Sequence, residues 1–154
     1  SMDRAIKKGA SAIAKHSILI KGTEHNKTID ETYLLIGNAY LYKLDYLKAI
    51  EAFSFTAKQF EGLTTAYQAS IGLARAYVLN KDLASAELVL DQLISDEDFP
   101  MSLNKDLSLA YADYHYQKGD LNLCIEELKA ALLESNKKKE TSLKTKMLLP
   151  LVLQ

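Results

Sequence analysis

Apolar residues recur at every third or fourth position along nearly the whole chain, and the strict alternation typical of strands is lacking. Glycine and proline, which most often interrupt helices, number only 6 and 2. The pattern therefore predicts an all-α protein of seven or eight helices. The expected helices cover residues 3–20, 30–42, 45–61, 64–79, 82–95, 103–117, 120–135 and 141–149, with polar loops at 22–27, 96–100 and 137–139.

A motif of small and aromatic residues occurs three times along the chain. Its first copy comprises Gly37, Tyr40, Asp45, Ala49 and Phe53. The matching residues are Ala74, Tyr77, Asp82, Ala86 and Leu90 in the second copy, and Ala112, His115, Asp120, Cys124 and Leu128 in the third. The small residues at the fourth position are spaced by 37 and then 38 residues. Self-similarity at such a period indicates stacked helix pairs, each with a first helix A and a second helix B.

Each motif position has a physical reason. Small residues on helices A and B let the two helices approach closely, and larger side chains there would cost ~1–3 kcal/mol through overpacking. The bulky residues Tyr40, Tyr77 and Phe53 are expected to fill the space between helices. An aspartate stands where each expected helix B begins: Asp45, Asp82 and Asp120. A carboxylate there can cap free amides and meet the positive end of the helix dipole.

Together these residues resemble the tetratricopeptide repeat. That resemblance implies a right-handed superhelix of antiparallel helix pairs whose concave face is lined by the A helices. The implied organisation is a single helical-repeat domain over residues 3–154, with a leading helix at 3–20, repeats at 30–62, 64–98 and 102–135, and a trailing helix at 141–153. Because the spacings exceed the usual ~34 residues, extended loops are expected around Gly62 and Pro100.

The first third of the chain carries a narrower resemblance. Ala12–Ser17, Ile29–Tyr42 and Ala49–Phe55 are similar to segments of the repeat-containing lipoproteins of gliding motility and type IX secretion, the PorW/SprE type. The match covers residues 3–60. It implies an outer-membrane lipoprotein that faces the periplasm and helps to couple an inner-membrane motor to the secretion apparatus. The lipid-bearing cysteine would lie upstream, because Cys124 stands mid-chain at a packing position.

The groove-facing positions of the A helices are the candidate partner-binding site, since the resemblance places bound segments there. By register these positions are Glu31, Leu34, Asn38, Leu41 and Tyr42 in the first repeat, Gln68, Ile71, Arg75, Val78 and Leu79 in the second, and Asp106, Leu109, Asp113, Tyr116 and Gln117 in the third. The alternative is that the flanking helices cover part of this surface. The carboxylate clamp of chaperone-binding relatives is not expected, because Leu34 and Leu109 replace its lysines and Asp113 would repel a carboxylate.

Composition narrows the choice of partners. The formal net charge of −1 gives no reason to expect nucleic acid or an anionic membrane. A single cysteine, Cys124, excludes an internal disulfide, and no stretch approaches the ~20 apolar residues of a membrane span. Ser1 and Met2 are interpreted as a cloning remnant and the chain as an excised fragment. Its apolar end at Met147–Leu153 is expected to contact further sequence or another molecule.

No catalytic, cofactor or metal site is predicted. His16, His25 and His115 lack a second ligand three or four residues away, and Asp96–Asp98 lacks the spacing of a calcium loop. The lysines between residues 137 and 146 are interpreted as a solvated face. A nucleophile elbow, a phosphate loop and paired catalytic carboxylates are not found at a recognisable spacing.

The sequence therefore predicts a non-enzymatic scaffold for protein–protein interactions. We interpret it as a piece of a periplasmic outer-membrane lipoprotein whose partners belong to the type IX secretion or gliding machinery. The alternative is a cytoplasmic peptide-binding adaptor or co-chaperone-like module with the same fold. The oligomeric state stays open, with dimerisation through the apolar end as a hypothesis.

Overall fold

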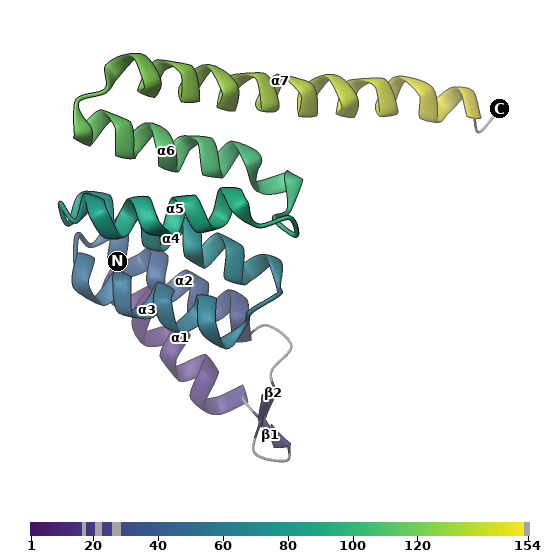
Figure 1. Cartoon of the computed structure of the whole chain (residues 1–154). Helices are drawn as coiled ribbons and strands as arrows, with labels where there is room; N and C mark the ends of the chain where they lie inside the picture. The colour runs from purple at the N-terminus through teal and green to yellow at the C-terminus, as the bar shows by residue number, and fades with distance from the viewer. Residues whose placement is uncertain (17, 21–22, 26–28, 153–154) are drawn as a thin grey trace. The chain divides into compact units, whose positions relative to one another are not determined.

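The computed structural model describes the backbone of residues 1–16, 18–20, 23–25 and 29–152 and the side chains of residues 1–12 and 29–139. Its elements are α1 (Met2–His16), β1 (Ile18–Ile20), β2 (Thr23–His25), α2 (Ile29–Tyr42), α3 (Tyr46–Gln59), α4 (Thr64–Leu79), α5 (Leu83–Ser95), the 3-10 helix η1 (Met101–Leu103), α6 (Asn104–Lys118) and α7 (Leu121–Val152). Figure 1 labels the α-helices and the two strands. Apart from the short hairpin, these elements are helical, as the apolar periodicity predicts.

The chain divides into two compact units, Ser1–Pro100 and Met101–Gln154. The single domain expected over residues 3–154 thus corresponds to two compact units. The first contains α1 to α5 and the hairpin, and the second contains η1, α6 and α7.

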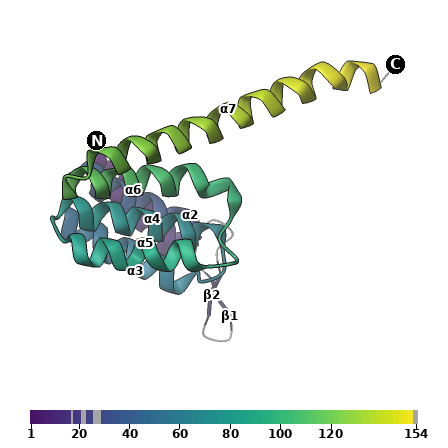
Figure 2. The same ribbon diagram turned by 45° about the horizontal axis from the view of Figure 1, so that its top comes forward.

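Helices in the first unit pack in chain order. Each of α1, α2, α3 and α4 contacts the next helix, and α4 also contacts α2. The hydroxyl of Thr65 in α4 donates to the carboxylate of Asp30 in α2, which adds a polar link between them. Figure 2 shows α2, α3, α4 and α5 grouped within the unit. In the second unit, α6 packs along α7. The predicted pairs α2–α3, α4–α5 and α6–α7 are therefore confirmed, and this arrangement fits a helical solenoid.

The turn inside each helix pair has the same backbone geometry in all three copies. Leu44 and Lys81 have φ of 64° and 66°, and Gly119 has φ of 93°. The next residue, an aspartate, donates its amide hydrogen to the carbonyl five residues earlier: Asp45 to Tyr40 at 3.0 Å, Asp82 to Tyr77 at 2.9 Å and Asp120 to His115 at 2.9 Å. This bond, beside a left-handed residue, is the Schellman helix ending. The sequence repeat is therefore also a backbone repeat.

Leu44 is a position where a substitution should raise stability. Its side chain is 68% exposed, and its left-handed backbone costs a residue with a Cβ roughly 1–2 kcal/mol. Leu44→Gly is expected to raise the free energy of unfolding by about 0.5–1 kcal/mol, since glycine's greater freedom in the unfolded chain offsets part of the gain. Urea denaturation measures the change. Glu51→Gly, at an exposed position within α3, is the control and should lower stability by a similar amount. A stability loss in Leu44→Gly would contradict the expectation.

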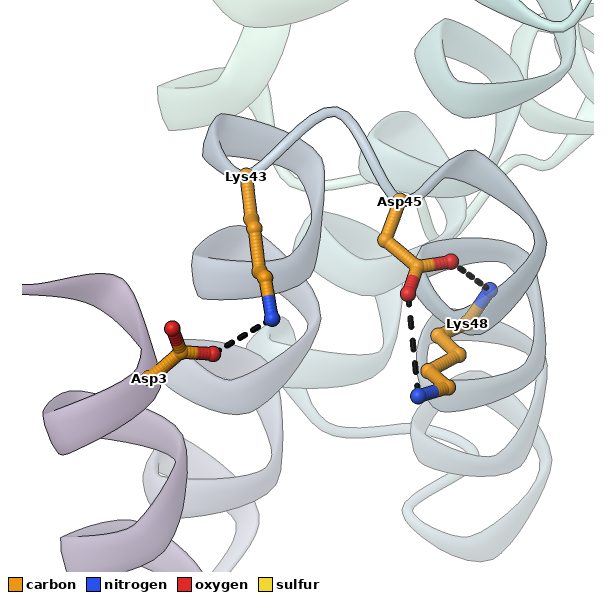
Figure 3. Close-up of polar contacts among 4 residues, drawn as sticks. All are labelled: Asp3, Lys43, Asp45 and Lys48. Atoms are coloured by element: carbon orange, nitrogen blue, oxygen red, sulfur yellow. Dashed lines mark hydrogen bonds and ion pairs between the residues drawn. The ribbon is translucent and has the colours of Figure 1, made fainter.

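Two of the three turn aspartates cap the following helix as predicted. Asp45 accepts from the Lys48 amide at 3.4 Å, and Lys48 Nζ lies 3.7 Å from its other carboxylate oxygen (Figure 3). Asp82 accepts from the Ser85 hydroxyl at 2.7 Å and from the Ser85 amide at 3.1 Å. These bonds lower the pKa of Asp82 below 3.8. Its contribution to stability is therefore present above that value and is lost as the pH falls through the lowered pKa. Capping by Asp120 stays a prediction.

Phe53 lies at the centre of the core of the first unit and is 0% exposed. A Cβ added to Gly37 in α2 would lie 2.6 Å from its ring, and one added to Gly72 in α4 would lie 2.7 Å away. The ring on α3 is thus held between the backbones of both neighbouring A helices. The other predicted small positions are also buried: Ala49, Ala74 and Ala86 at 0%, Ala112 at 3% and Cys124 at 9% exposed.

Helix α1 is held at two points, one on α2 and one on Lys43, the residue after the end of α2. At Gly9, an added Cβ would lie 2.9 Å from Ile36, and near the start of the helix Asp3 pairs with Lys43 (Figure 3). The hydrogen bond and charge of Lys43 lower the pKa of Asp3 below 3.8, and Asp3 raises the pKa of Lys43 above 10.5. The pair is intact between the two shifted values and is lost as the pH falls through the first or rises through the second. Because both side chains are exposed, solvent screening keeps its contribution small.

The leading helix predicted at 3–20 is wrong for Ile18–Ile20, and residue 17 lies outside the described part of the chain. Ile18–Ile20 instead pairs antiparallel with Thr23–His25, with Ile20 opposite Thr23. β-branched residues favour an extended backbone, and two intervening residues are the commonest spacing in hairpins. The polar loop predicted at 22–27 is likewise wrong for Thr23–His25, and its other residues, 22 and 26–27, lie outside the described part of the chain.

The predicted break at 137–139 and the separate trailing helix at 141–153 are also wrong. Helix α7 runs without interruption from Leu121 to Val152. Lysine and glutamate are good helix formers, and the sequence contains neither glycine nor proline between Leu121 and Pro150, so a polar run here continues the helix. Lys137–Lys139 are exposed, which agrees with the solvated face expected there. Lys138 donates to the Ser102 carbonyl at 3.1 Å. Leu153 and the side chains of Lys144 and Lys146 lie outside the described part.

Candidate functional site

The candidate site is a face shared by helices α2 and α4. Within the described part of the chain, two other faces of each helix pack against neighbouring helices, and this third face does not. In α2, Gly37 faces Phe53 of α3, whereas Ile36 faces Gly9 of α1. Residues spaced by four, seven and eleven positions share one helix face. The third face of α2 and its counterpart on α4, 37 residues later, together form what we call the A-helix strip. Its members are Glu31, Leu35, Asn38 and Tyr42 on α2 and Gln68, Arg75 and Leu79 on α4.

The A-helix strip is accessible to solvent along both helices. Tyr42 and Leu35 on α2 are 75% and 55% exposed, and Leu79 on α4 is 39% exposed. Glu31, Gln68 and Arg75 are also exposed, and Asn38 is half-buried. Of the ten positions predicted on these two helices, Glu31, Asn38, Tyr42, Gln68, Arg75 and Leu79 are therefore in the strip.

The other four predicted positions on α2 and α4 belong to the packed interior. Leu34 and Leu41 are half-buried against a core cluster that includes Leu73 of α4. Their counterparts Ile71 and Val78 are only 6% and 1% exposed, so a partner cannot reach them. The predicted register combined two neighbouring faces of each A helix. One faces solvent, and the other contributes to helix packing.

Leu35 belongs to the strip but was not among the predicted residues. It occupies the position equivalent to Gly72, which on α4 faces Phe53 and is therefore closed to partners. The sequence does carry a signal: a leucine aligns with a glycine. That mismatch shows that the two positions have different surroundings, although it does not show which of them is exposed.

The third set of predicted residues lies on α6, in the second unit. Asp106 and Tyr116 are exposed, and Leu109, Asp113 and Gln117 are half-buried. Asp106 is exposed like its counterpart Gln68 in the A-helix strip, whereas Tyr116 is 62% exposed although its counterpart Val78 belongs to the packed interior of α4. These residues form a surface of the second unit considered by itself.

The strip offers contacts of three kinds to an extended polypeptide. The side-chain amides of Asn38 and Gln68 can both donate and accept hydrogen bonds, which suits a peptide backbone. Tyr42, Leu35 and Leu79 supply apolar surface, and Tyr42 adds a hydroxyl group. Glu31 and Arg75 are side chains of opposite charge on neighbouring helices. They can set the direction of a bound segment whose two ends carry opposite charges.

A cleft of about 530 Å³ opens on the other side of α4, between the ends of α3 and α5. Its lining residue Ala66 precedes Arg75 by nine positions, which is half a turn around the helix. The Tyr67 hydroxyl donates to Asp96 at 2.9 Å, and its ring meets the Phe99 ring edge-on at 5.6 Å. The hydrogen bond to Asp96, followed by burial and nearby carboxylates, raises the pKa of Tyr67 above 10.0. The sequence prediction missed this cleft.

In the loop expected at 96–100, residues 96–98 are exposed, Phe99 and Pro100 are half-buried, and hydrogen bonds to Asp96 tie the loop down. Asp96 accepts from Tyr67 and also from the amide of Asp98 at 2.9 Å. Among the residues that the structure describes, no three His, Cys, Asp or Glu side chains gather in a way that could hold a metal ion. His115 contacts the rings of Tyr111 and Tyr114, in keeping with its expected place among aromatic packing residues.

Within the described ranges, none of the helices is both long and apolar enough for a membrane span. Neither the known protein-family models nor the curated proteins give a match to this sequence.

Proposed function

We propose that this chain is a non-enzymatic scaffold of the tetratricopeptide type, which binds an extended segment of a partner protein along the A-helix strip. One observation carries the proposal. Glu31, Leu35 and Tyr42 on α2 and Gln68, Arg75 and Leu79 on α4 are exposed, and Asn38 is half-buried between them, while every other residue of both helices except Thr64 is buried or half-buried. A repeated exposed face on two contacting helices is the surface that stacked repeats present to ligands.

The proposed superhelix is supported by the repeated turns and by the way α4 packs on both α2 and α3. A right-handed rise from pair to pair would place successive A helices along one concave wall. The partner segment would then cross the helices and meet Asn38 on the first and Gln68 and Arg75 on the second.

The narrower proposal concerns the compartment. From the resemblance of residues 3–60, we propose that the chain is part of a periplasmic outer-membrane lipoprotein that contacts components of a secretion or gliding apparatus. The encoded protein would then begin with a lipoprotein signal that ends at a lipidated cysteine. Cell fractionation and metabolic lipid labelling test this. Unlabelled protein in the cytosolic fraction would favour the cytoplasmic adaptor instead.

The binding function can be tested with ligands selected from a random peptide library. Ligands that use the A-helix strip should lose at least tenfold in affinity when Asn38 and Arg75 are both replaced by alanine, because central polar contacts of an interface commonly contribute 1 kcal/mol or more each. The matched control replaces Lys58 and Gln92, which line the cleft on the other side, and should change affinity less than twofold. Circular dichroism confirms folding. Ligands that respond only to the control pair would contradict the proposed site.

A further inference from the structure

Helix α7 carries an apolar stripe that is exposed to solvent. Leu121, Ile125, Leu128 and Leu132 are 56%, 48%, 47% and 61% exposed. Their spacing of four, seven and eleven residues places them on one side of the helix. The adjacent side, which contains Cys124 and Ala131 at 9% and 4% exposure, is buried. We call the four exposed residues the α7 stripe.

The first helix pair shows what occupies the equivalent surface in this fold. The repeat aligns Leu128 with Phe53, Ile125 with Ile50 and Leu132 with Ala57. On α3, these three equivalents pack into a cluster with residues of α4, the next A helix. Three of the α4 residues at this interface are small, Ala69, Gly72 and Ala76, and Leu73 and Tyr77 pack beside them. The same repeat position is thus covered by a helix on α3 and exposed on α7.

The chemistry of the α3–α4 interface also defines the occupant that would fit. Phe53 can be buried because Gly72 allows the α4 backbone to approach its ring. A helix that covers Leu128 in the same way needs a small residue at that point, and further small residues one turn to either side. A second copy of α7 would instead place leucine against leucine. Helix α1 of a second copy presents mainly charged and polar residues, such as Arg4, Lys7 and Lys8, on its exposed side.

We propose that the α7 stripe docks an α-helix of a separate partner protein, with small residues at the spacing of Ala69, Gly72 and Ala76. The helix would lie against α7 as α4 lies against α3. Contiguous exposed apolar surface on a helix is unfavourable in water, and a docked helix of this kind would cover it. The site is separate from the A-helix strip.

The test uses the full chain and a synthetic probe with the sequence of residues 63–80, which contains α4. A fluorescent label on this peptide reports binding by anisotropy. Saturable binding is expected, and Leu128→Asp should weaken it at least tenfold. Leu133→Asp is the matched control, since Leu133 is 61% exposed but lies 140° further around the helix, and it should change affinity less than twofold. A probe in which the residue corresponding to Gly72 is leucine should also bind at least tenfold more weakly.

Each outcome decides the proposal. Absence of saturable binding, or equal loss in Leu128→Asp and Leu133→Asp, would overturn it. Self-association of the chain that Leu128→Asp abolishes would assign the stripe to a second copy and would also overturn the partner helix. Peptides that bind the A-helix strip should be unaffected by Leu128→Asp, so failure here is distinguishable from failure of the proposed function.

Discussion

Replacing Phe53 with alanine is expected to lower the free energy of unfolding by about 3–5 kcal/mol, the largest effect of any single substitution considered for this chain. The side chain is 0% exposed, and its ring fills the space between Gly37 and Gly72. Removing it leaves a cavity that two helix backbones border. Because backbones cannot rearrange as freely as side chains, the cavity should close only in part, which favours the upper end of the range.

Phe55 provides a matched control in the same helix. It is the same residue type, but it is 45% exposed and contacts Tyr33 at the surface, with ring centroids 4.9 Å apart. Phe55→Ala should therefore cost about 1 kcal/mol, the contribution of a half-exposed aromatic pair. Guanidinium denaturation of both variants measures the contrast. Equal losses in Phe53→Ala and Phe55→Ala would show that Phe53 is not the central core residue.

Replacing Gly72 with valine is expected to destabilise the fold by about 3 kcal/mol through overpacking. The new Cβ would lie 2.7 Å from the Phe53 ring. The two methyl groups of valine would add further atoms close to this ring. Valine is a slightly better helix former than glycine, which offsets only a few tenths of a kcal/mol. The helices α3 and α4 must therefore separate, or the Phe53 ring must leave its position.

A double-mutant cycle identifies the cause of that loss. In a Phe53→Leu background the ring is absent, so Gly72→Val should cost at least about 1 kcal/mol less than in the parent chain. Gln68→Val, at an exposed position one turn earlier in α4, is the control and should stay within about 0.5 kcal/mol of the parent. If Gly72→Val costs the same in both backgrounds, the contact between residues 53 and 72 is not the reason for the loss.

The helices and their pairing could be predicted from the sequence because each is encoded locally. The 3.6-residue periodicity defines the helices. The aspartates Asp45 and Asp82 directly precede α3 and α5 and mark where these helices begin. Gly37, Ala49 and Phe53 recur with their equivalents at fixed spacing, so the pairing of A with B helices follows from the repeat. The left-handed residues Leu44 and Lys81 carry no such signal, since neither is a glycine. Only their place before the aspartate identifies them.

The errors arose where the outcome depends on surroundings. Leu34 and Ile71 have the helical spacing of groove residues, but Leu34 packs against a core cluster that includes residues of α4, and Ile71 is only 6% exposed. No local pattern reports such packing. The run at 136–140 is polar enough for a loop, yet its lysines and glutamate also suit an exposed helix. At Ile18–Ile20, three apolar residues fit either a helix end or a strand, and pairing with Thr23–His25 selects the strand.

The most direct test of the account is an NMR titration of the isotopically labelled chain with a selected peptide ligand. The titration identifies the residues whose amide signals shift when the ligand binds. The account predicts that the largest shifts fall at Glu31, Leu35, Asn38, Gln68 and Arg75, on the exposed side of α2 and α4. Ligands whose shifts gather instead around Lys58, Tyr67 and Gln92, on the other side of α4, would contradict it.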